Sequence, residues 1–312
     1  MSETNRNRRG RRSATYVLLQ AVLERMSKQH AEAPADIPRM RHGLKKGLGR
    51  MGHAPASKVS VTQRSVEGVG CLEFTPVNAR GAAVILYVHG GGYCLGSTEA
   101  YRGVVSRMCA SLGRTMVMPE YRLAPEHPYP AGLEDLEVAV SALSPSKSQA
   151  PLVVMGDSAG GGLALALAQQ MCGREDLPDP DGLVLYSPWV DLRCESPSTA
   201  SGATTDWVVR PQWLRTFAGM YAGALAVSDP RVTPLLGDHG GLPPTLLEVG
   251  GLEVLRDDAR RLNSELERVG VATTFVEDPK GIHVWQIYLP WLPEARESMA
   301  RTHAFLAARV EG

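Results

Sequence analysis

Short runs of hydrophobic residues without polar alternation recur along the chain from residue 82 onward. The clearest is AAVILYV at residues 82–88, a pattern typical of a strand that is buried on both faces of a sheet. Runs of the same kind follow at residues 115–119, 152–156, 183–186, 246–250 and 273–276. Between them, apolar residues recur at helical spacing in the segments 99–112, 131–144, 158–172, 256–269 and 294–309. This alternation predicts an α/β fold whose parallel sheet is covered by helices on both faces.

The part of the chain before residue 82 follows a different pattern. Apolar residues at helix-like spacing predict a helix over residues 14–28; they are Tyr16, Leu18, Leu19, Val22, Leu23 and Met26. Residues 31–56 are rich in Ala, Pro, Gly, Lys and Arg and carry little strand signal. Residues 57–66 and 71–75 then alternate between polar and apolar side chains, which predicts an antiparallel hairpin.

One interval interrupts the alternation of strands and helices. Residues 192–228 carry no clear strand; a polar loop is followed by an aromatic helical stretch around Trp213, Phe217 and Tyr221. An insertion of this length inside an α/β domain usually forms a lid or a binding element. We expect the same of this segment.

The composition indicates a globular protein that does not depend on nucleic acid. Hydrophobic residues make up 44% of the 312 residues and charged residues 21%, which is enough apolar material for a sizeable core. The 33 Lys and Arg residues balance the 33 Asp and Glu residues, whereas binding to a phosphate backbone requires a surplus of positive charge. We therefore expect no nucleic-acid partner.

Three further features predict a cytoplasmic protein. The cysteines are scattered singly without a CxxC pair, which favours reduced thiols; they are Cys71, Cys94, Cys109, Cys172 and Cys194. No apolar run approaches the ~18–20 residues that a membrane span requires, so we expect no stable membrane insertion. The arginine cluster at residues 6–12 is not followed by the apolar core and cleavage site of a secretory signal. We interpret it as a solvated, frayed terminus rather than a surface for RNA or lipid headgroups.

The segment Gly156-Asp157-Ser158-Ala159-Gly160 carries the sharpest chemical signal. It lies between an apolar run and a helical pattern. A serine between two glycines at such a junction can occupy a strained turn, because a Cβ at either glycine would clash with the neighbouring strand or helix. The turn presents the hydroxyl above the sheet edge, at the positive end of a helix. Ser158 is therefore a candidate nucleophile.

A second signal, His89-Gly90-Gly91-Gly92, directly follows the strand predicted at 82–88. Consecutive glycines leave backbone N–H groups exposed and let them approach a ligand closely. Such a loop can bind the negative oxygen that develops when an ester carbonyl is attacked. The alternatives are a flexible glycine turn and a phosphate-binding loop, but this loop is part of neither a GKS/T nor a GxGxxG motif.

A nucleophilic serine requires a general base, and three histidines follow Ser158 in the chain. His303 lies inside the last helical pattern among charged neighbours, so we expect it on a solvated face. His239 lies in Gly-Asp-His-Gly-Gly, which indicates a surface turn. His283 lies in a loop just after the strand predicted at 273–276, at the edge of the sheet where ligands gather. We therefore predict His283 as the base.

The acid that orients this base should follow the strand predicted at 246–250. Glu253 lies three residues after that strand, whereas Asp257 and Asp258 begin the next helical pattern. Carboxylates at a helix N-terminus are common for capping and dipole reasons, which gives the two aspartates a structural explanation. Asp191 is a weaker alternative because it precedes the insertion. Glu253 is therefore the first of four candidates.

These segments together resemble the bacterial hormone-sensitive-lipase-like carboxylesterases, over roughly residues 57–310. The motifs that carry the resemblance are His89-Gly90-Gly91-Gly92-Tyr93, Tyr121-Arg122-Leu123-Ala124-Pro125-Glu126 followed by His127-Pro128-Tyr129-Pro130-Ala131, Gly156-Asp157-Ser158-Ala159-Gly160-Gly161, Ser187-Pro188-Trp189-Val190-Asp191, Pro243-Pro244-Thr245 and the run ending Glu253-Val254-Leu255-Arg256-Asp257.

The resemblance implies an α/β-hydrolase fold with a helical cap, and hydrolysis of short- to medium-chain acyl esters without a cofactor or a metal. It implies Ser158 as nucleophile, His283 as base and Glu253 as acid. The oxyanion hole that it implies consists of the N–H groups of Gly91, Gly92 and Ala159, in a loop supported by His89 and Gly90. Most members have Asp where this chain has Glu253. Because Glu is one methylene longer, we expect this loop to lie slightly further from His283.

The resemblance also implies a division of the chain and further polar roles. Residues 1–55 would form the N-terminal part of the cap, 56–191 and 229–312 the two parts of the hydrolase core, and 192–228 the cap insertion. Tyr93 and Asp157 are candidate substrate contacts. We also interpret Asp157, with Arg122 and Glu126, as a polar group that holds loops by hydrogen bonds.

Other functions and an assembly are also compatible with these motifs. Plant gibberellin receptors resemble the same family but lack a working triad histidine, whereas His283 is present here. Among enzymes, the alternatives are an amidase or deacetylase and a true lipase, which needs an exposed apolar surface. Family members often dimerise through the edge of the last strand, so residues 272–277 could supply a homodimer edge.

Overall fold

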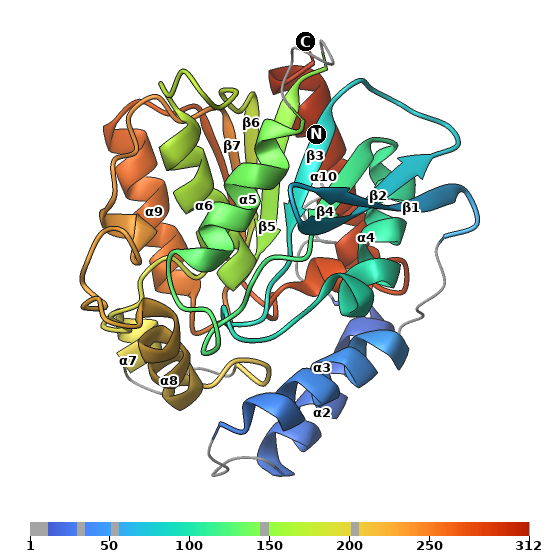
Figure 1. The fold of residues 1–312 in the computed structure, drawn as a ribbon. Coiled ribbons are helices and arrows are strands. Elements are labelled where there is room, and N and C mark those ends of the chain that lie inside the picture. The colour runs from blue at the N-terminus through green and yellow to red at the C-terminus, as the bar shows by residue number, and fades with distance from the viewer. Residues whose placement is uncertain (1–11, 30–34, 51–55, 144–149, 201–205, 312) are drawn as a thin grey trace.

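The computed structural model describes residues 12–29, 35–50, 56–143, 150–200 and 206–311, and within them eight strands form one sheet (Figure 1). The strand order is β1-β2-β4-β3-β5-β6-β7-β8. β2 (Val69–Pro76) pairs antiparallel with β1 (Val59–Val66) and with β4 (Thr115–Pro119). All remaining pairs are parallel. The mostly parallel α/β sheet and the N-terminal hairpin expected from the sequence are confirmed.

The central strands are buried on both faces, which explains their unbroken apolar sequences. β5 (Leu152–Asp157), β6 (Gly182–Tyr186) and β7 (Thr245–Gly250) are buried at every residue. β3 (Val84–Val88) is buried at four of its five residues. β8 (Thr273–Asp278) is the outer strand and is only partly buried. The edge expected to support a homodimer is thus the edge of the sheet, and the homodimer itself stays a prediction.

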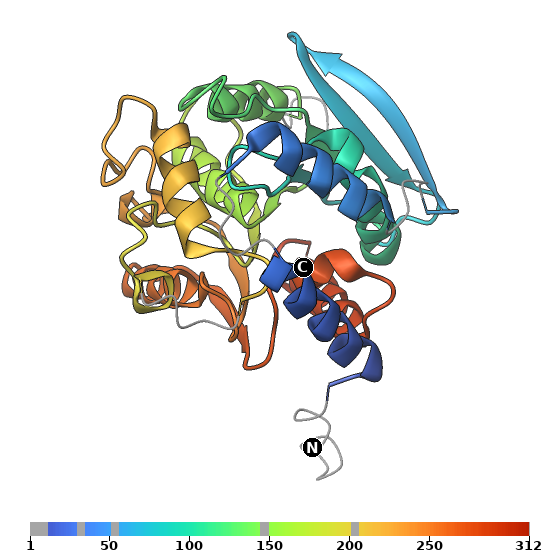
Figure 2. The ribbon, with the colours of Figure 1, turned by 90° about the horizontal axis from the view of Figure 1, so that it is seen from below.

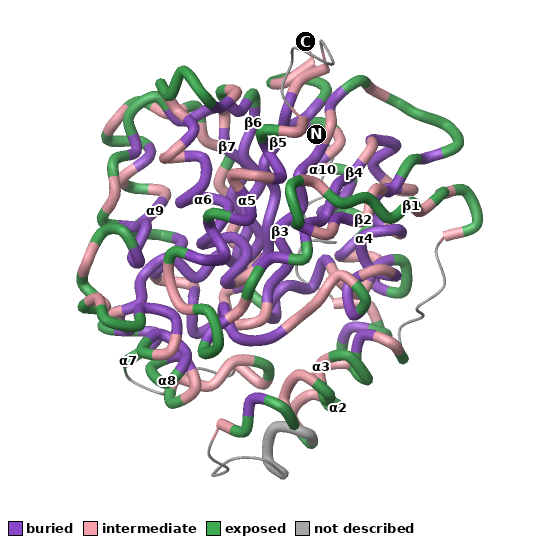
Figure 3. Tube along the Cα trace, in the orientation of Figure 1, coloured by how far each residue is buried: buried purple, intermediate pink, exposed green. Residues whose placement is uncertain are grey.

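Helices cover the two faces of the sheet and enclose two hydrophobic cores. α5 (Ala131–Ser141), α6 (Ala159–Met171) and α9 (Arg256–Arg268) lie on the face toward the viewer in Figure 1. α4 (Thr98–Leu112) and α10 (Pro293–Arg309) pack together on the other face. Figure 3 shows the buried backbone concentrated in the sheet and in the inner sides of these helices.

The remaining helices lie beyond the carboxyl ends of the parallel strands (Figures 1 and 2). α2 (Ala14–Gln29) and α3 (Ile37–Arg50) come from the N-terminal segment, and α7 (Pro197–Ala200) and α8 (Pro211–Ala222) from the insertion. Two 3₁₀ turns, η2 (Pro234–Leu236) and η3 (Trp285–Tyr288), complete the described helices. The aromatic helix expected around Trp213, Phe217 and Tyr221 is α8.

The interpretation of the arginine cluster as a solvated terminus is wrong for Arg12. Its Nη1 lies 2.8 Å from Asp278 Oδ2, and its guanidinium stacks over the Tyr16 ring at 4.5 Å. The paired carboxylate and the aromatic face hold Arg12 against the body of the protein. The other arginines of the cluster, at residues 6–11, lie outside the described residues.

Two other expectations concerned the cysteines, predicted to be reduced thiols, and the membrane, into which no stable insertion was predicted. Cys71, Cys94, Cys109 and Cys194 are buried, Cys172 is half-buried, and all five are free thiols. None of the described helices combines the length and the hydropathy that a membrane span requires.

Candidate active site

Ser158 is the single residue between the end of β5 at Asp157 and the start of α6 at Ala159. Its backbone has φ +54° and ψ −126°, a conformation that L residues adopt only under strain. The Ser158 N–H donates to the Tyr186 carbonyl at 2.9 Å, which ties the strained turn to β6. The sequence predicted this strained strand-to-helix turn.

The glycines on either side of Ser158 allow three backbone segments to approach one another. A Cβ on Gly156 would collide with the Gly160 carbonyl, and a Cβ on Gly160 would collide with the Val88 carbonyl. Both positions therefore exclude side chains for steric reasons, as the sequence pattern indicated. The close packing fixes the height of Ser158 above the sheet edge.

Ser158, His283 and Glu253 form a continuous hydrogen-bonded chain. His283 Nε2 lies 3.0 Å from Ser158 Oγ, and His283 Nδ1 lies 2.7 Å from Glu253 Oε2. His283 is 6% exposed and Glu253 is fully buried. Of the histidines and carboxylates considered from the sequence, these are the ones that the fold brings to Ser158.

The Glu253 carboxylate is held by two more donors. The Ser187 hydroxyl donates to its Oε1 at 2.7 Å, and the Gly250 N–H donates to the same oxygen at 2.6 Å. Ser187 Oγ also accepts from the Val284 N–H at 3.2 Å, so it joins the acid to the residue that follows His283. The Ser187-Pro188-Trp189 motif does not by itself reveal this role of Ser187, because its partners Glu253 and Val284 lie far away in sequence.

Burial and charge act on the two ionisable members of this chain in opposite ways. Burial raises the pKa of Glu253, and the His283 ring and the Ser187 hydroxyl oppose that rise. Burial lowers the pKa of His283, but the charge and hydrogen bond of Glu253, together with the charges of Asp206 and Asp157, raise it. The net pKa of His283 lies above its ordinary value of 6.5, which means that the site stabilises a protonated imidazole.

Asp157 fixes the glycine loop against β5. Its Oδ1 accepts the Gly90 N–H at 3.0 Å and the Tyr87 hydroxyl at 2.7 Å, and its Oδ2 accepts the Tyr101 hydroxyl at 3.1 Å. Burial raises the pKa of Asp157, and these donors oppose the rise. The carboxyl group thus holds the loop by hydrogen bonds, as the sequence suggested.

His89 supports the same loop from its other side. The ring lies fully buried and stacks on the Tyr121 ring with centroids 4.4 Å apart. Its Nδ1 lies 3.0 Å from the Gly90 carbonyl oxygen. Because burial lowers the pKa of His89, this ring is neutral near pH 7 and acts as a packing and hydrogen-bonding group.

The loop leaves backbone donors beside Ser158. Gly91 has φ +133° and Gly92 has φ +62°, so both need the conformational freedom of glycine. Among the hydrogen bonds of the described residues, none uses the N–H of Gly91, Gly92 or Ala159. Ala159 is the first residue of α6, where an N–H has no partner within the helix. These groups can donate to an anionic oxygen next to Ser158 Oγ.

An apolar cavity of about 180 Å³ opens onto Ser158 and His283. α3 contributes Met40 and Leu44 to its wall, and α8 contributes Trp213, Leu214 and Phe217. The Phe217 ring lies against Gly92, where any added Cβ would strike it. The N-terminal segment and the insertion therefore line one cavity with the glycine loop.

Two sequence expectations about histidines outside the site are wrong. His239 is 3% exposed rather than in a surface turn; its Nε2 lies 3.2 Å from the Leu235 carbonyl and its Nδ1 lies 3.0 Å from Gln169. His303 is half-buried rather than solvated, because its Nδ1 contacts Arg114 at 2.7 Å. The residues that flank each histidine in the sequence do not include its partner, which is Gln169 for His239 and Arg114 for His303.

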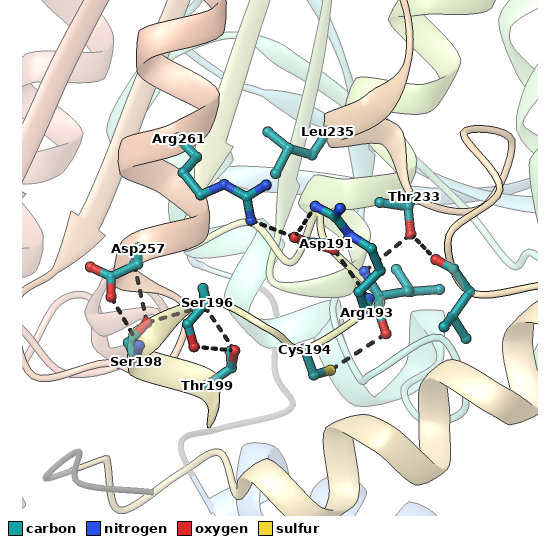
Figure 4. Close-up of polar contacts among 12 residues, drawn as sticks. Asp191, Arg193, Cys194, Ser196, Ser198, Thr199, Thr233, Leu235, Asp257 and Arg261 are labelled. Atoms are coloured by element: carbon teal, nitrogen blue, oxygen red, sulfur yellow. Dashed lines mark hydrogen bonds and ion pairs between the residues drawn. The ribbon is translucent and has the colours of Figure 1, made fainter. Parts of the chain in front are cut away.

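Two of the other candidate acids, Asp191 and Asp257, have structural partners other than His283 (Figure 4). Asp191 is fully buried and paired with Arg193 and Arg261. Asp257 accepts the Ser198 N–H at 2.9 Å, which anchors α7. Asp258 is fully buried, and burial together with the charge of Asp191 raises its pKa to about 8.

Tyr93 is not among the side chains that line the cavity. Its hydroxyl donates to the Trp189 carbonyl at 2.7 Å, and its ring stacks on Tyr221 with centroids 4.1 Å apart. This aromatic stack joins the glycine loop to α8, and a contact of Tyr93 with substrate stays a prediction. Asp157 does line the cavity. Within the described residues, no group of three or more His, Cys, Asp or Glu side chains could hold a metal ion.

The chain is similar to known hydrolases in sequence and in fold. A family model described as the alpha/beta hydrolase fold matches residues 85–287. The chain is 36% identical over 260 residues to an acetyl-hydrolase of Streptomyces hygroscopicus, covering 83% of this chain and 85% of that protein. It is 32% identical over 224 residues to an esterase of Acinetobacter venetianus, covering 71% and 74%. A crystal structure of an esterase from the bacterial hormone-sensitive lipase family superimposes with a TM-score of 0.84 at 33% identity, covering 93% of this chain and 98% of that one.

Proposed function

The chain belongs to the bacterial hormone-sensitive lipase family of the α/β-hydrolase fold and is a carboxylic-ester hydrolase, and we propose that it cleaves short- to medium-chain acyl esters with Ser158, His283 and Glu253. The observation that carries this proposal is the chain of contacts from Ser158 Oγ through both ring nitrogens of His283 to Glu253, at 3.0 and 2.7 Å. The apolar cavity at Ser158 suits an acyl chain.

The reaction proceeds in two acyl-transfer steps. His283 Nε2 takes the proton of the Ser158 hydroxyl as Oγ attacks the ester carbonyl. The N–H groups of Gly91, Gly92 and Ala159 donate to the oxyanion of the tetrahedral intermediate. The protonated His283 gives its proton to the leaving alcohol, and a water activated by His283 then hydrolyses the acyl-Ser158 ester.

Glu253 stabilises the imidazolium that forms in both steps. The carboxylate keeps Nδ1 protonated and directs Nε2 at the hydroxyl. The direction of the His283 pKa shift fits this role, because the same charge that raises that pKa favours the protonated intermediate. We further propose that residues 1–55 and 192–228 together form the cap, since α3 and α8 share the wall of the cavity.

Hydrolysis of p-nitrophenyl butyrate by Ser158→Ala and His283→Ala tests this function. We expect kcat to fall by roughly 10⁶-fold in each variant, on the scale of other serine triads. Activity near that of the original chain in Ser158→Ala would refute the proposal. An acyl-chain series then separates the alternatives: tributyrin without triolein activity indicates an esterase rather than a lipase, and p-nitroanilide turnover indicates an amidase.

A further inference from the structure

The residue that follows the proposed acid is held by the insertion through both of its backbone polar groups. The Val254 N–H donates to Asp206 Oδ2 at 3.1 Å, and the Ser198 hydroxyl donates to the Val254 carbonyl at 2.6 Å. Asp206 and Ser198 both belong to the 192–228 insertion. The two peptide groups on either side of Val254 are thus each held by one residue of the insertion.

Asp206 also shapes the wall of the cavity. Its Oδ1 accepts the N–H groups of Val208 at 2.8 Å and Val209 at 2.9 Å, an Asx turn that sets the direction of the chain there. Val208 and Val209 line the cavity at Ser158. One carboxylate therefore connects the substrate side of the insertion to the loop that carries Glu253.

A second pair of hydrogen bonds joins Ser198 of α7 to Asp257 in the first turn of α9. The Ser198 N–H donates to Asp257 Oδ2, and its hydroxyl accepts from the Asp257 N–H at 3.3 Å (Figure 4). This tie fixes α7 to the start of α9, immediately after the acid loop. The insertion is consequently bound to the Glu253 loop at both Asp206 and Ser198.

We propose that Asp206 is a positioning residue for the ester-hydrolysis reaction, which couples the cavity wall at residues 208–209 to the placement of Glu253 beside His283. This inference rests on the proposed function of the triad. It assigns the insertion a part in the chemical step as well as in substrate binding. Three carboxylates act on the His283 ring, namely Glu253, Asp206 and Asp157, and each raises its pKa.

Two substitutions separate the turn that Asp206 forms in the cavity wall from its contact with the acid loop. Asp206→Ala removes the acceptors of three N–H groups and frees the Glu253 loop, so we expect kcat for p-nitrophenyl butyrate to fall roughly tenfold or more with a smaller change in KM. Asp206→Asn keeps an acceptor at Oδ1 for the turn at Val208 and Val209, but it removes the charge and its Nδ2 group cannot accept the Val254 N–H. We expect its kcat at high pH to fall about as far as that of Asp206→Ala, and the acid limb of its kcat/KM profile to move to lower pH because the pKa of His283 falls.

Asp229 provides the matched control. It forms the same kind of turn, accepting the Arg231 N–H at 2.9 Å, on the exposed side of the chain. Asp229→Ala and Asp229→Asn should leave kcat, KM and the acid limb unchanged. Thermal melting of all variants measures folding, and Asp206→Asn keeps the test open if Asp206→Ala does not fold.

Two outcomes would overturn the inference. The first is an Asp206→Ala variant whose defect is confined to KM, and the second is an Asp206→Asn variant whose acid limb coincides with that of the original chain. Ser158→Ala in the same assay keeps the two proposals apart. If that variant stays active the proposed function fails, whereas an inactive Ser158→Ala with unaffected Asp206 variants rejects only the coupling.

Discussion

Shortening Glu253 to aspartate should separate the acid from His283 without removing it. Glu253 makes three contacts of 2.6–2.7 Å, to Gly250 N, Ser187 Oγ and His283 Nδ1. The loop cannot follow a shorter side chain, because the Val254 backbone is held on both sides by the insertion. One methylene withdraws the carboxylate by about 1.5 Å, so the contact with Nδ1 opens to about 4 Å.

A displacement of this size in a proton-transfer chain should cost roughly 10²-fold in kcat, or about 2.7 kcal/mol of transition-state stabilisation. Complete removal in Glu253→Ala should cost roughly 10⁴-fold, the scale seen when a triad carboxylate is lost. KM should change little in either variant, because Glu253 does not line the cavity. Initial rates with p-nitrophenyl butyrate over a range of substrate concentrations give both constants.

Glu265→Asp is the matched control, since this partly exposed residue of α9 forms an ion pair with Arg268 on the same helix and should be indifferent to shortening. Asp257→Ala tests the identity of the acid, and we expect it to lose less than about tenfold. The reasoning would be refuted if Glu253→Asp kept the original kcat, or if Asp257→Ala lost as much activity as Glu253→Ala.

The remaining predictions concern pH, the support of the acid and the cavity. Because His283 acts as a base only when neutral and its pKa is raised, kcat/KM should fall as pH drops through a midpoint above 6.5; a midpoint below 6.5 would contradict the raised pKa. Ser187→Ala removes one donor to Glu253 and one acceptor from Val284, so kcat should fall roughly tenfold while KM stays constant in steady-state assays; unchanged kcat would show that Gly250 alone holds the acid. Phe217→Ala opens the cavity beside Gly92, so the ratio of kcat/KM for the octanoyl to the acetyl p-nitrophenyl ester should rise at least about tenfold; a constant ratio would place the acyl chain elsewhere.

The parts of the fold that the sequence predicts best are those whose burial pattern is simple. β5, β6 and β7 are buried at every residue, and their apolar runs locate them within a residue or two. α3 was missed because Pro, three Gly and six basic residues mask its stripe. Ile37, Met40, Leu44 and Leu48 nevertheless recur at helical spacing and face the protein.

Some residues of the candidate site could be predicted from the sequence, and others could not. Ser158, His283 and Glu253 were predicted because each lies in the segment that follows a predicted strand, and parallel strands bring their carboxyl ends to one edge. Ser187 and Asp206 were not, because their importance depends on partners 66 and 48 residues away in sequence. A polar side chain whose hydrogen-bond partner is set by tertiary structure leaves no local pattern.

The same limit explains the wrong environments of His239 and His303. Both occur in polar local sequences, yet Gln169 and Arg114 lie 70 and 189 residues away. The His239 ring is buried and the His303 ring is half-buried, each beside a partner from another element of the fold. The exposure of a polar side chain is therefore hardest to predict when it contacts a polar residue that is distant in sequence.

Covalent capture of the nucleophile tests the central claim most directly. The full chain is incubated with a fluorophosphonate, and the modified peptide is identified by mass spectrometry. We expect one adduct per chain, on Ser158, with loss of esterase activity in proportion to labelling, no adduct in Ser158→Ala and greatly slowed labelling in His283→Ala. Stoichiometric, inactivating modification at another residue, or labelling of Ser158 at an undiminished rate without His283, would contradict the account.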